Sequence, residues 1–395
     1  MTANDPRLEE IASKYNIPEP YDDSHPAVQE ADGIEVDVED ELDDRVDLRG
    51  MPAFTVDPDD AKDYDDAITI EQEDDGYRAY VHIADVSHYV EQGSELDQAA
   101  KDRGVTFYLG ENTRHMFPEE LASDICSLVE GEDRLAHTVE MELGKDFNGD
   151  YEIQDFDIYE SVIQVDEGLS YTEADHILEN GDESYDDELL DQLDLADDLT
   201  QDIRDDRWEY SLIINNDESP SSRVVEEMML KANQAVARHL LDAGKPGIYR
   251  VEDHPDPEWE EEVEEDLAEE GYTKQAGWLS EADNPKKKLN EFFEQEINEE
   301  DDEEVKKAVI TKMKPAEYST RDDTHFALDF EKYAQFTSPI RRVGDLVNHR
   351  MVKRDPPEDS EEFLREIERV QDVVGRLNQR HASAKQADRA YDRMT

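Results

Sequence analysis

Six aspartates stand between two strand-like runs in the stretch FTVDPDDAKDYDDAITI at residues 54–70. The flanking runs FTV and AITI are rich in β-branched and aromatic residues, which favour buried strands. Asp57-Pro58 predicts a turn out of the first strand. The stretch therefore predicts several carboxylates at the edge of a buried element. Such carboxylates repel one another unless a hard cation such as Mg²⁺ joins them.

The overall composition weakens this metal interpretation, because 108 of the 395 residues are Asp or Glu. In so acidic a chain, any pattern of four fixed acidic positions arises by chance about twice. The acidic spacing alone therefore identifies nothing. Two interpretations stay open: a solvated acidic turn, or a metal site whose four carboxylates are Asp57, Asp63, Asp65 and Asp66.

The formal net charge of −68 is spread along the whole chain and suits a protein of a halophile's cytoplasm. In about 1 M salt the Debye length is roughly 3 Å, so only local charge affects binding and nucleic acid is not excluded as a partner. The single cysteine excludes an intramolecular disulfide, as expected in a reducing compartment. The N-terminus does not resemble a signal peptide, and no apolar run is long enough to span a membrane. We therefore expect a cytoplasmic protein.

The chain pattern predicts an α+β fold with one mixed α/β domain, in which helices flank a central sheet. Residues 1–45 form an acidic N-terminal arm with a short helix, and the domain occupies residues 46–395. The sequence from residue 46 to about residue 163 is typical of strands joined by turns. The alternation of apolar and polar residues in YRAYVHIADVSHYV predicts a strand at 77–90. Helical spacing and capping residues predict helices within 170–210, 221–247, 255–305 and 361–395.

A second informative stretch is YAQFTSPIRRVGDLVNHR at residues 333–350. Ser338 is a suitable N-cap and Pro339 a suitable first residue, so a helix is expected to begin there. Arg341 and Arg342 would then lie in the first turn, where the helix dipole disfavours cations. This arrangement predicts an anion nearby, and a phosphate is the usual one.

An ordinary surface helix explains the same stretch through an Arg341–Asp345 ion pair at i,i+4 spacing. Sequence alone leaves both interpretations open. Basic residues do gather in this part of the chain, however, because 12 of the 40 Lys and Arg residues fall within 341–395. Local positive charge in so acidic a chain favours a polyanionic ligand.

Long segments that include many uncharged positions closely resemble the catalytic (RNB) domain of the ribonuclease II/ribonuclease R family. They follow the family's order from about Val46 to the last helix, and acidic composition alone does not produce them. The segments are RVDLRGMPAFTVDPDDAKDYDDAITI, YVHIADVSHYV, RVVEEMMLKANQAVARHLLDAGKPGIYRV and HFALDFEKYAQFTSPIRRVGDLVNHR.

The resemblance implies a processive 3′-to-5′ exoribonuclease that hydrolyses single-stranded RNA to nucleoside 5′-monophosphates, using Mg²⁺ or Mn²⁺. It implies that Asp65 is the residue most closely tied to catalysis. The aspartates that match the family's metal-holding cluster are Asp57, Asp63, Asp65 and Asp66. By the same resemblance, Arg341 grips the phosphate near the 3′ end with Arg342 beside it. Tyr108 packs against the 3′-terminal nucleotide.

This sequence departs from the family pattern in two places. Lys385 and Gln386 stand where family members carry a glutamate that separates the last bases. The OB-type barrels that usually flank the catalytic domain are not found in this sequence, so a partner chain could supply them. These departures keep an alternative open, in which the chain is a catalytically impaired RNA-binding regulator on the same fold.

Overall fold

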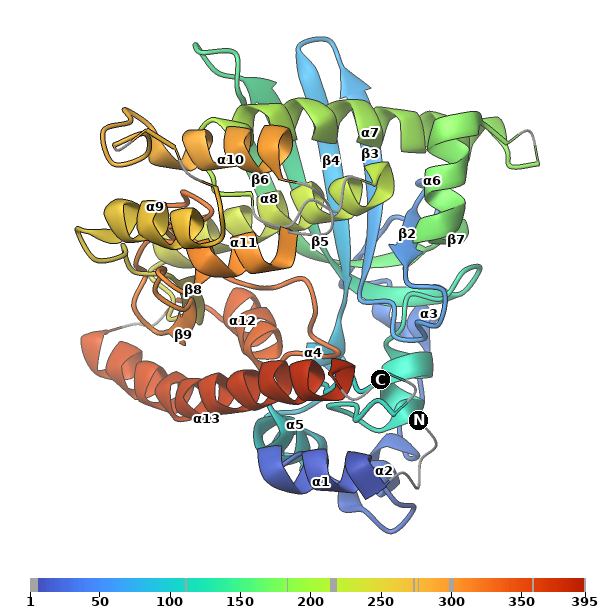
Figure 1. Ribbon diagram of the computed structural model, residues 1–395. Helices are drawn as coiled ribbons and strands as arrows, with labels where there is room; N and C mark the ends of the chain where they lie inside the picture. The colour runs from blue at the N-terminus through green and yellow to red at the C-terminus, as the bar shows by residue number, and fades with distance from the viewer. Residues whose placement is uncertain are drawn as a thin grey trace.

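The computed structural model describes residues 6–393, except residues 111, 183, 214–218, 273, 276, 298–301 and 357–358. A seven-stranded mixed sheet forms the centre, and helices cover it, as Figure 1 shows. The predicted fold class, a mixed α/β domain with helices on a central sheet, is confirmed.

The sheet has the strand order β1-β6-β5-β4-β3-β2-β7. The outer pairs β1–β6 and β2–β7 are parallel, and all other neighbours are antiparallel. A separate antiparallel pair is formed by β8 and β9. The strands are β1 Val46–Asp47, β2 Phe54–Asp57, β3 Asp66–Glu73, β4 Gly76–Ala84, β5 Asp133–Lys145, β6 Tyr151–Gln164, β7 Glu167–Ser170, β8 Tyr249–Val251 and β9 Glu317–Ser319.

The two strands expected around the aspartates are confirmed as β2 and β3, and the turn after Asp57 is also present. The strand expected at 77–90 is only partly correct, because β4 ends at Ala84. Asp85 then accepts a hydrogen bond from the backbone N–H of His88 and caps a short helix, α4 (Val86–Tyr89). The cap turns the chain out of the sheet.

Most of the expected helices are present. The helix expected at 221–247 is α8, which Ser219 caps and Pro220 begins. Its apolar face packs on β4, β5 and β6. The remaining helices are α1 Pro6–Tyr15, α2 Pro26–Ala31, α3 Val38–Glu41, α5 Glu95–Arg103, α6 Tyr171–Asn180, α7 Asp187–Trp208, α9 Trp259–Glu269, α10 Pro285–Glu296, α11 Asp302–Ile310, α12 Val343–Lys353 and α13 Ser360–Asp392, with a π-helical turn at Leu121–Ile125.

The predicted start of the helix at Ser338 is wrong, because α12 begins at Val343. Arg342 is extended, with φ −138° and ψ 119°, and forms an isolated antiparallel bridge with Val105. The Val343 N–H donates to the Gly104 carbonyl at 3.0 Å. These pairings hold the two arginines outside the helix, so the expected dipole argument does not apply to them.

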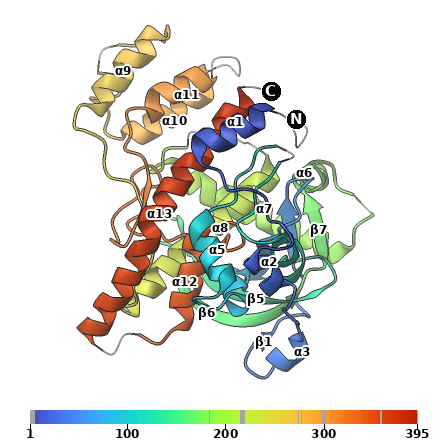
Figure 2. The same cartoon turned by 90° about the horizontal axis from the view of Figure 1, so that it is seen from below.

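The N-terminal segment packs against the rest of the molecule. Leu8 and Ile11 of α1 are buried in the main hydrophobic cluster, and α1 lies beside the end of α13 in Figure 2. The domain boundary at residues 45 and 46 stays a prediction. Helices α9 to α11 have a smaller hydrophobic cluster of their own, which includes Trp259 and Phe292.

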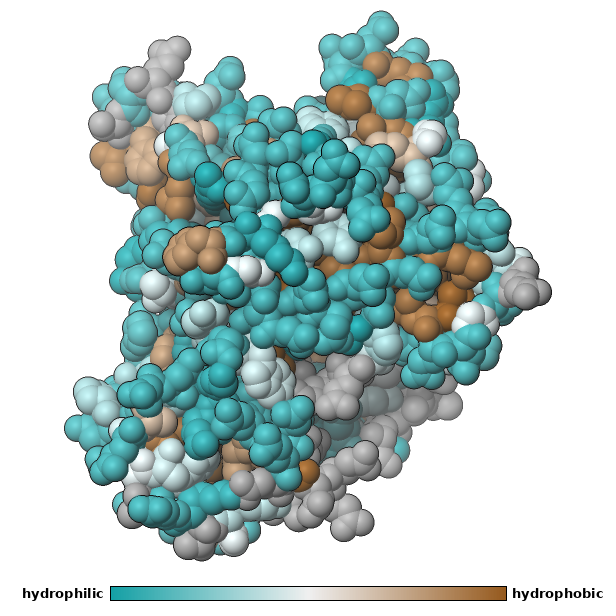
Figure 3. Space-filling model, turned by 90° about the horizontal axis from the view of Figure 1, so that it is seen from above, coloured by the Kyte–Doolittle hydropathy of each residue, from teal (hydrophilic) through white to brown (hydrophobic). Residues whose placement is uncertain are grey.

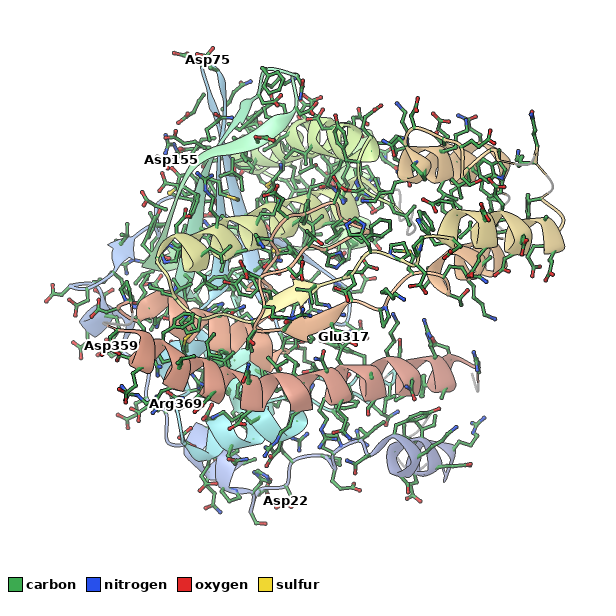
Figure 4. The ribbon with its side chains drawn as sticks, turned by 90° about the vertical axis from the view of Figure 1, so that its left-hand side faces the viewer. Asp22, Asp75, Asp155, Glu317, Asp359 and Arg369 are labelled. Atoms are coloured by element: carbon green, nitrogen blue, oxygen red, sulfur yellow. The ribbon has the colours of Figure 1, made fainter. Side chains whose placement is uncertain are left out.

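Hydrophilic residues cover most of the face in Figure 3, as the charge of the chain requires. Acidic side chains such as Asp22, Asp75 and Asp155 lie at the outer edges of the molecule in Figure 4. No helix in the described part of the chain is both long enough and apolar enough to cross a membrane.

Candidate active site

The loop between β2 and β3 forms one wall of a cavity of about 610 Å³. Six of the seven residues that the resemblance singled out line this cavity, although they come from distant parts of the chain. They are Asp57, Asp63, Asp65, Asp66, Tyr108 and Arg341. The four carboxylates therefore share one cavity with one arginine and one tyrosine.

Asp65 is the most firmly held of the four aspartates and is 3% exposed. Its backbone carbonyl accepts a hydrogen bond from the Ala84 N–H at the end of β4. Its Oδ1 accepts a hydrogen bond from the Ile340 N–H at 2.9 Å, and its Oδ2 lies 3.4 Å from Nε of Arg341. The carboxylate is thus fixed between the sheet and the segment that precedes α12.

Burial and neighbouring negative charge shift the pKa values of three of the cavity aspartates. Burial, then the nearby Asp66 carboxylate, raises the pKa of Asp57 to about 8. Burial raises the pKa of Asp66 to about 6, although Arg341 opposes the shift. Burial also raises the pKa of Asp65 well above its ordinary value, again against Arg341. Each of these carboxylates is costly to ionise without additional positive charge.

The donor set fits a hard divalent cation. Oδ2 of Asp63 and Oδ2 of Asp65 are buried and accept no hydrogen bond from any described residue. Carboxylate oxygens are the ligands that Mg²⁺ and Mn²⁺ take, and a cation would relieve the repulsion that raises the pKa of Asp57. The residues available to hold it are Asp57, Asp63, Asp65 and Asp66.

The raised pKa values predict how pH affects cation binding. An unfolded Asp has a pKa of about 3.9, so the folded, metal-free protein binds more protons than the unfolded chain between about pH 4 and pH 8. Its stability therefore falls as the pH rises through this window. Because Mg²⁺ competes with these protons, we expect a larger rise in Tm on adding Mg²⁺ at about pH 8 than at about pH 6. Thermal scans with and without MgCl₂ measure this difference.

Asp57→Asn provides the test of that explanation. This variant lacks the carboxyl with the pKa of about 8, so the Mg²⁺-dependent rise in Tm should depend much less on pH. Equal rises at both pH values in the unmodified protein would contradict the prediction.

Arg341 and Tyr108 line the same cavity as the aspartates. The Arg341 side chain is 43% exposed, and its Nη2 donates to Oγ of Ser338 at 3.1 Å. Tyr108 is 44% exposed. Burial of its hydroxyl raises the pKa of Tyr108 to about 12, although the Arg341 charge opposes this shift. Both side chains combine a fixed position with surface that is free to contact a ligand.

Arg342 does not line this cavity. Its Nε and Nη2 donate to Oδ2 of the buried Asp345, at 3.0 and 2.6 Å. The pair on this segment is thus Arg342–Asp345 at i,i+3 spacing, whereas the surface-helix interpretation expected Arg341–Asp345. A direct role of Arg342 in RNA binding stays a prediction.

A second cluster of metal-ligand residue types lies in the core. Within the described ranges, Asp85, His137 and His349 are the one group of three whose ligand atoms all lie within 4.8 Å of one another. Arg45 and Lys353 each donate to Oδ2 of Asp85 at 2.7 Å. These two cations already neutralise the carboxylate, so we interpret the cluster as a structural ion-pair centre. The four cavity aspartates are spread more widely than this group.

Sequence reasoning missed the parts that hold the site together. The Ile340 N–H and Ser338 Oγ fix Asp65 and Arg341, and Tyr171 of α6 adds to the cavity wall. The Ile340 contact carries no sequence signal, since it joins residues 275 positions apart, and the Ser-Pro pair at Ser338 was interpreted as a helix start. The Asp85 cluster was also missed, because its members stand 52 and 212 residues apart.

Comparison with known families decides the identity of the fold. The family profile described as "RNB domain" matches residues 45–355. The chain belongs to the RNB-domain family. The match spans the aspartate loop, the Tyr108 loop and the Arg341 segment, so every residue that lines the cavity falls within it.

Relatives and solved structures agree with this assignment. Ribonuclease R of Aquifex aeolicus is 33% identical over 410 aligned positions, which cover 96% of this chain and 56% of that protein. The chain spans about half the length of the curated relatives it matches. The structure of Mycoplasma genitalium RNase R in complex with ribose-methylated single-stranded RNA superposes with a TM-score of 0.85 at 24% identity, covering 98% of this chain and 63% of that one.

The fold also occurs without nuclease activity. Yeast Ssd1, described as a pseudonuclease, superposes with a TM-score of 0.72 at 18% identity, covering 96% of this chain and 50% of that one. Similarity at this level shows the fold alone. The residues of the cavity therefore have to carry any argument about activity.

Proposed function

We propose that the chain is a metal-dependent 3′-to-5′ exoribonuclease that shortens single-stranded RNA and releases nucleoside 5′-monophosphates. One observation carries this proposal: the four aspartates, Arg341 and Tyr108 line a single cavity. Carboxylates that can hold a cation, next to an arginine that can grip a phosphate, suit hydrolysis of a phosphodiester. In this proposal the catalytic unit is residues 46–395.

Arg341 and Tyr108 position the end of the RNA. The Arg341 guanidinium, held by Ser338 beside Asp65, forms charge-assisted hydrogen bonds with the scissile phosphate. The exposed surface of Tyr108 stacks on the 3′-terminal nucleoside. These contacts read no base edges, so the enzyme accepts any sequence. The 2′-hydroxyl is the group by which such a site distinguishes RNA from DNA.

Asp57, Asp63, Asp65 and Asp66 hold the cation in this proposal. Bound there, Mg²⁺ or Mn²⁺ would supply a nucleophilic water at neutral pH and would stabilise the charge of the transition state. The hydrogen bond from Ile340 keeps Asp65 in one orientation, and Arg341 offsets the negative charge that builds up on the phosphate.

A non-catalytic RNA-binding role is the alternative, and the fold permits it because yeast Ssd1 is a pseudonuclease. The cavity of this chain argues against that role. All four aspartates are present, and two of their buried oxygens lack hydrogen bonds within the described structure. A protein that only binds RNA, which is itself anionic, has no use for several buried carboxylates that share a single arginine.

An RNA labelled at its 5′ end tests the proposal directly. With Mg²⁺ or Mn²⁺, in molar KCl to screen the charge of −68, we expect a ladder of products that shortens from the 3′ end. EDTA should stop the shortening, and added Mg²⁺ should restore it. RNA labelled at its 3′ end should yield labelled mononucleotide from the first turnover.

Two outcomes would contradict this function. Internal cleavage fragments would indicate an endonuclease. Intact RNA, bound by a folded protein in the presence of Mg²⁺ and Mn²⁺, would favour the regulator.

A further inference from the structure

A second set of basic side chains lies between the β8–β9 pair and α13. Figure 4 shows these two strands directly against α13. Arg250 extends from β8, and His381, Lys385 and Arg389 follow one another at i,i+4 spacing along one face of α13. We call these four residues the α13 basic cluster.

Tyr318 of β9 is the centre around which the cluster is built. Its backbone N–H and carbonyl are both hydrogen-bonded by the Asn378 side chain at 2.8 Å, which locks β9 onto α13. The Arg250 guanidinium lies 4.5 Å from the centre of the Tyr318 ring. The His381 ring meets the same ring edge-on at 5.6 Å, and Arg250 Nη2 lies 3.3 Å from His381 Nε2.

The positive charge of the cluster is poorly compensated. Within the described part of the chain, no ion pair involves Arg250 or Lys385, and Nη1 of Arg250 and Oη of Tyr318 are buried without a hydrogen bond. Glu252 is near Arg250 but already pairs with His325 at 3.1 Å. In a chain with 108 acidic residues against 40 basic ones, two neighbouring basic side chains without an ion-pair partner remain available to an anionic ligand.

The neighbouring positive charges lower the pKa values of two residues of the α13 basic cluster. Burial, then the charges of Arg250, Lys385 and Arg342, lowers the pKa of His381 to about 4. Burial, then Arg389 and Arg250, lowers the pKa of Lys385. Asp388 lies close to Arg389 and offsets part of that charge. The remaining cations repel one another, and an anionic ligand would remove this repulsion.

Two links join the cluster to the catalytic cavity. Arg342, which adds to the positive charge at His381, directly follows Arg341. The same helix then reaches the rim of the cavity, where a Cβ on Gly110 would lie only 2.6 Å from the Tyr391 hydroxyl. The residue two positions before Gly110 is Tyr108. Helix α13 thus spans from the cluster to the loop proposed to hold the 3′ nucleotide.

We propose that the α13 basic cluster, through Arg250 and Lys385, binds the RNA phosphate that follows the scissile one on its 5′ side. The inference rests on the proposed function. The Arg250 guanidinium lies over a tyrosine ring, and its Nη1 has no hydrogen-bond partner, so its charge can act on a nearby phosphate. The exposed Lys385 adds a second charge that a phosphate oxygen can contact directly. A strand whose 3′-terminal nucleotide occupies the cavity has further phosphates only on the 5′ side. The phosphate that we assign to the cluster is therefore the second from the 3′ end, directly on the 5′ side of the scissile phosphate.

The released nucleoside 5′-monophosphate presents the same chemistry, so the test has to separate the two ligands. We use RNA in which a methylphosphonate removes the negative charge at the second linkage from the 3′ end. The protein carries Asp65→Asn to block turnover, and equilibrium Kd values are measured in Mg²⁺. Lys385→Met is the test variant, because it keeps the side-chain length and removes the charge.

For ordinary RNA we expect Lys385→Met to raise Kd about tenfold, and the methylphosphonate to raise the Kd of the parent by a similar factor. Combined, the two changes should raise Kd little beyond either one alone, since both remove the same contact. Arg365→Gln is the matched control: Arg365 lies on α13, is 58% exposed and pairs with Glu361. It should bind ordinary RNA like the parent and keep the full methylphosphonate effect.

If the factors by which Lys385→Met and the methylphosphonate raise Kd simply multiply, the inference is overturned, because Lys385 then contacts something other than this phosphate. A weaker affinity of Lys385→Met for a 5′-monophosphate, with an unchanged methylphosphonate effect, would assign the cluster to the product and also overturn it. Both results leave the proposed function intact if the unmodified protein still shortens RNA. A protein that binds RNA through this phosphate but never shortens it would instead refute the proposed function alone.

Discussion

Replacing Asp65 with Asn is expected to lower the rate of RNA shortening by roughly a thousandfold or more, while Kd for RNA changes less than about threefold. Asn keeps the oxygen that accepts the Ile340 N–H, so the 2.9 Å hydrogen bond and the local fold persist. It replaces the charged oxygen that lies 3.4 Å from Arg341. The change therefore removes the negative charge that a metal cation and Arg341 would share, and leaves the backbone contact in place.

Single-turnover rates in saturating Mg²⁺ and Kd values from fluorescence anisotropy separate the two effects. Asp59→Asn is the matched control, since Asp59 belongs to the same loop but is exposed and does not line the cavity. It should retain the full rate. A parallel loss of binding and rate in Asp65→Asn would show that Asp65 supports RNA binding or the fold, which contradicts a catalytic role.

The sequence predicted the fold class and several residues of the cavity, because the first depends on local patterns and the second on long family motifs. Strand propensity placed β2 and β3 on either side of the aspartates. Acidic spacing alone did not distinguish a metal site from a solvated turn. The uncharged residues of the family motifs led to the hypothesis that Asp57 and Arg341 belong to one site. The cavity that both residues line agrees with that hypothesis.

Sequence reasoning failed where long-range pairing overrides a local signal. The Ser-Pro pair at 338–339 has the chemistry of a helix start, but a backbone bridge from Val105 to Arg342 delays the helix to Val343. The hydrogen bond from Ile340 to Asp65 joins residues 275 positions apart. Arg250 and His381, which are 131 positions apart, meet at 3.3 Å. Neither contact leaves a periodicity or spacing that a single sequence reveals.

The second large effect is expected at Arg341. Its guanidinium lies beside Asp65 and is held by Ser338 Oγ, so its fork of donors is already oriented toward the cavity. Replacement by Ala should lower kcat/KM about a hundredfold, because the scissile phosphate loses a charge-assisted hydrogen bond that strengthens in the transition state. Arg341→Lys should lose about tenfold, since an ammonium keeps the charge but cannot form paired, planar hydrogen bonds.

Arg321→Ala provides the matched control, because Arg321 is 71% exposed and does not line the cavity. It removes an arginine without touching the site and should leave kcat/KM unchanged. The two Arg341 variants are informative together. If kcat/KM falls in both variants, and falls further in Ala than in Lys, the site requires a cation with directed hydrogen-bond donors at this position. Unchanged kinetics in Arg341→Ala would remove Arg341 from the site. Equal losses in Ala and Lys, with a lowered Tm in both, would indicate that Arg341 stabilises the buried Asp65 carboxylate and does not grip the phosphate.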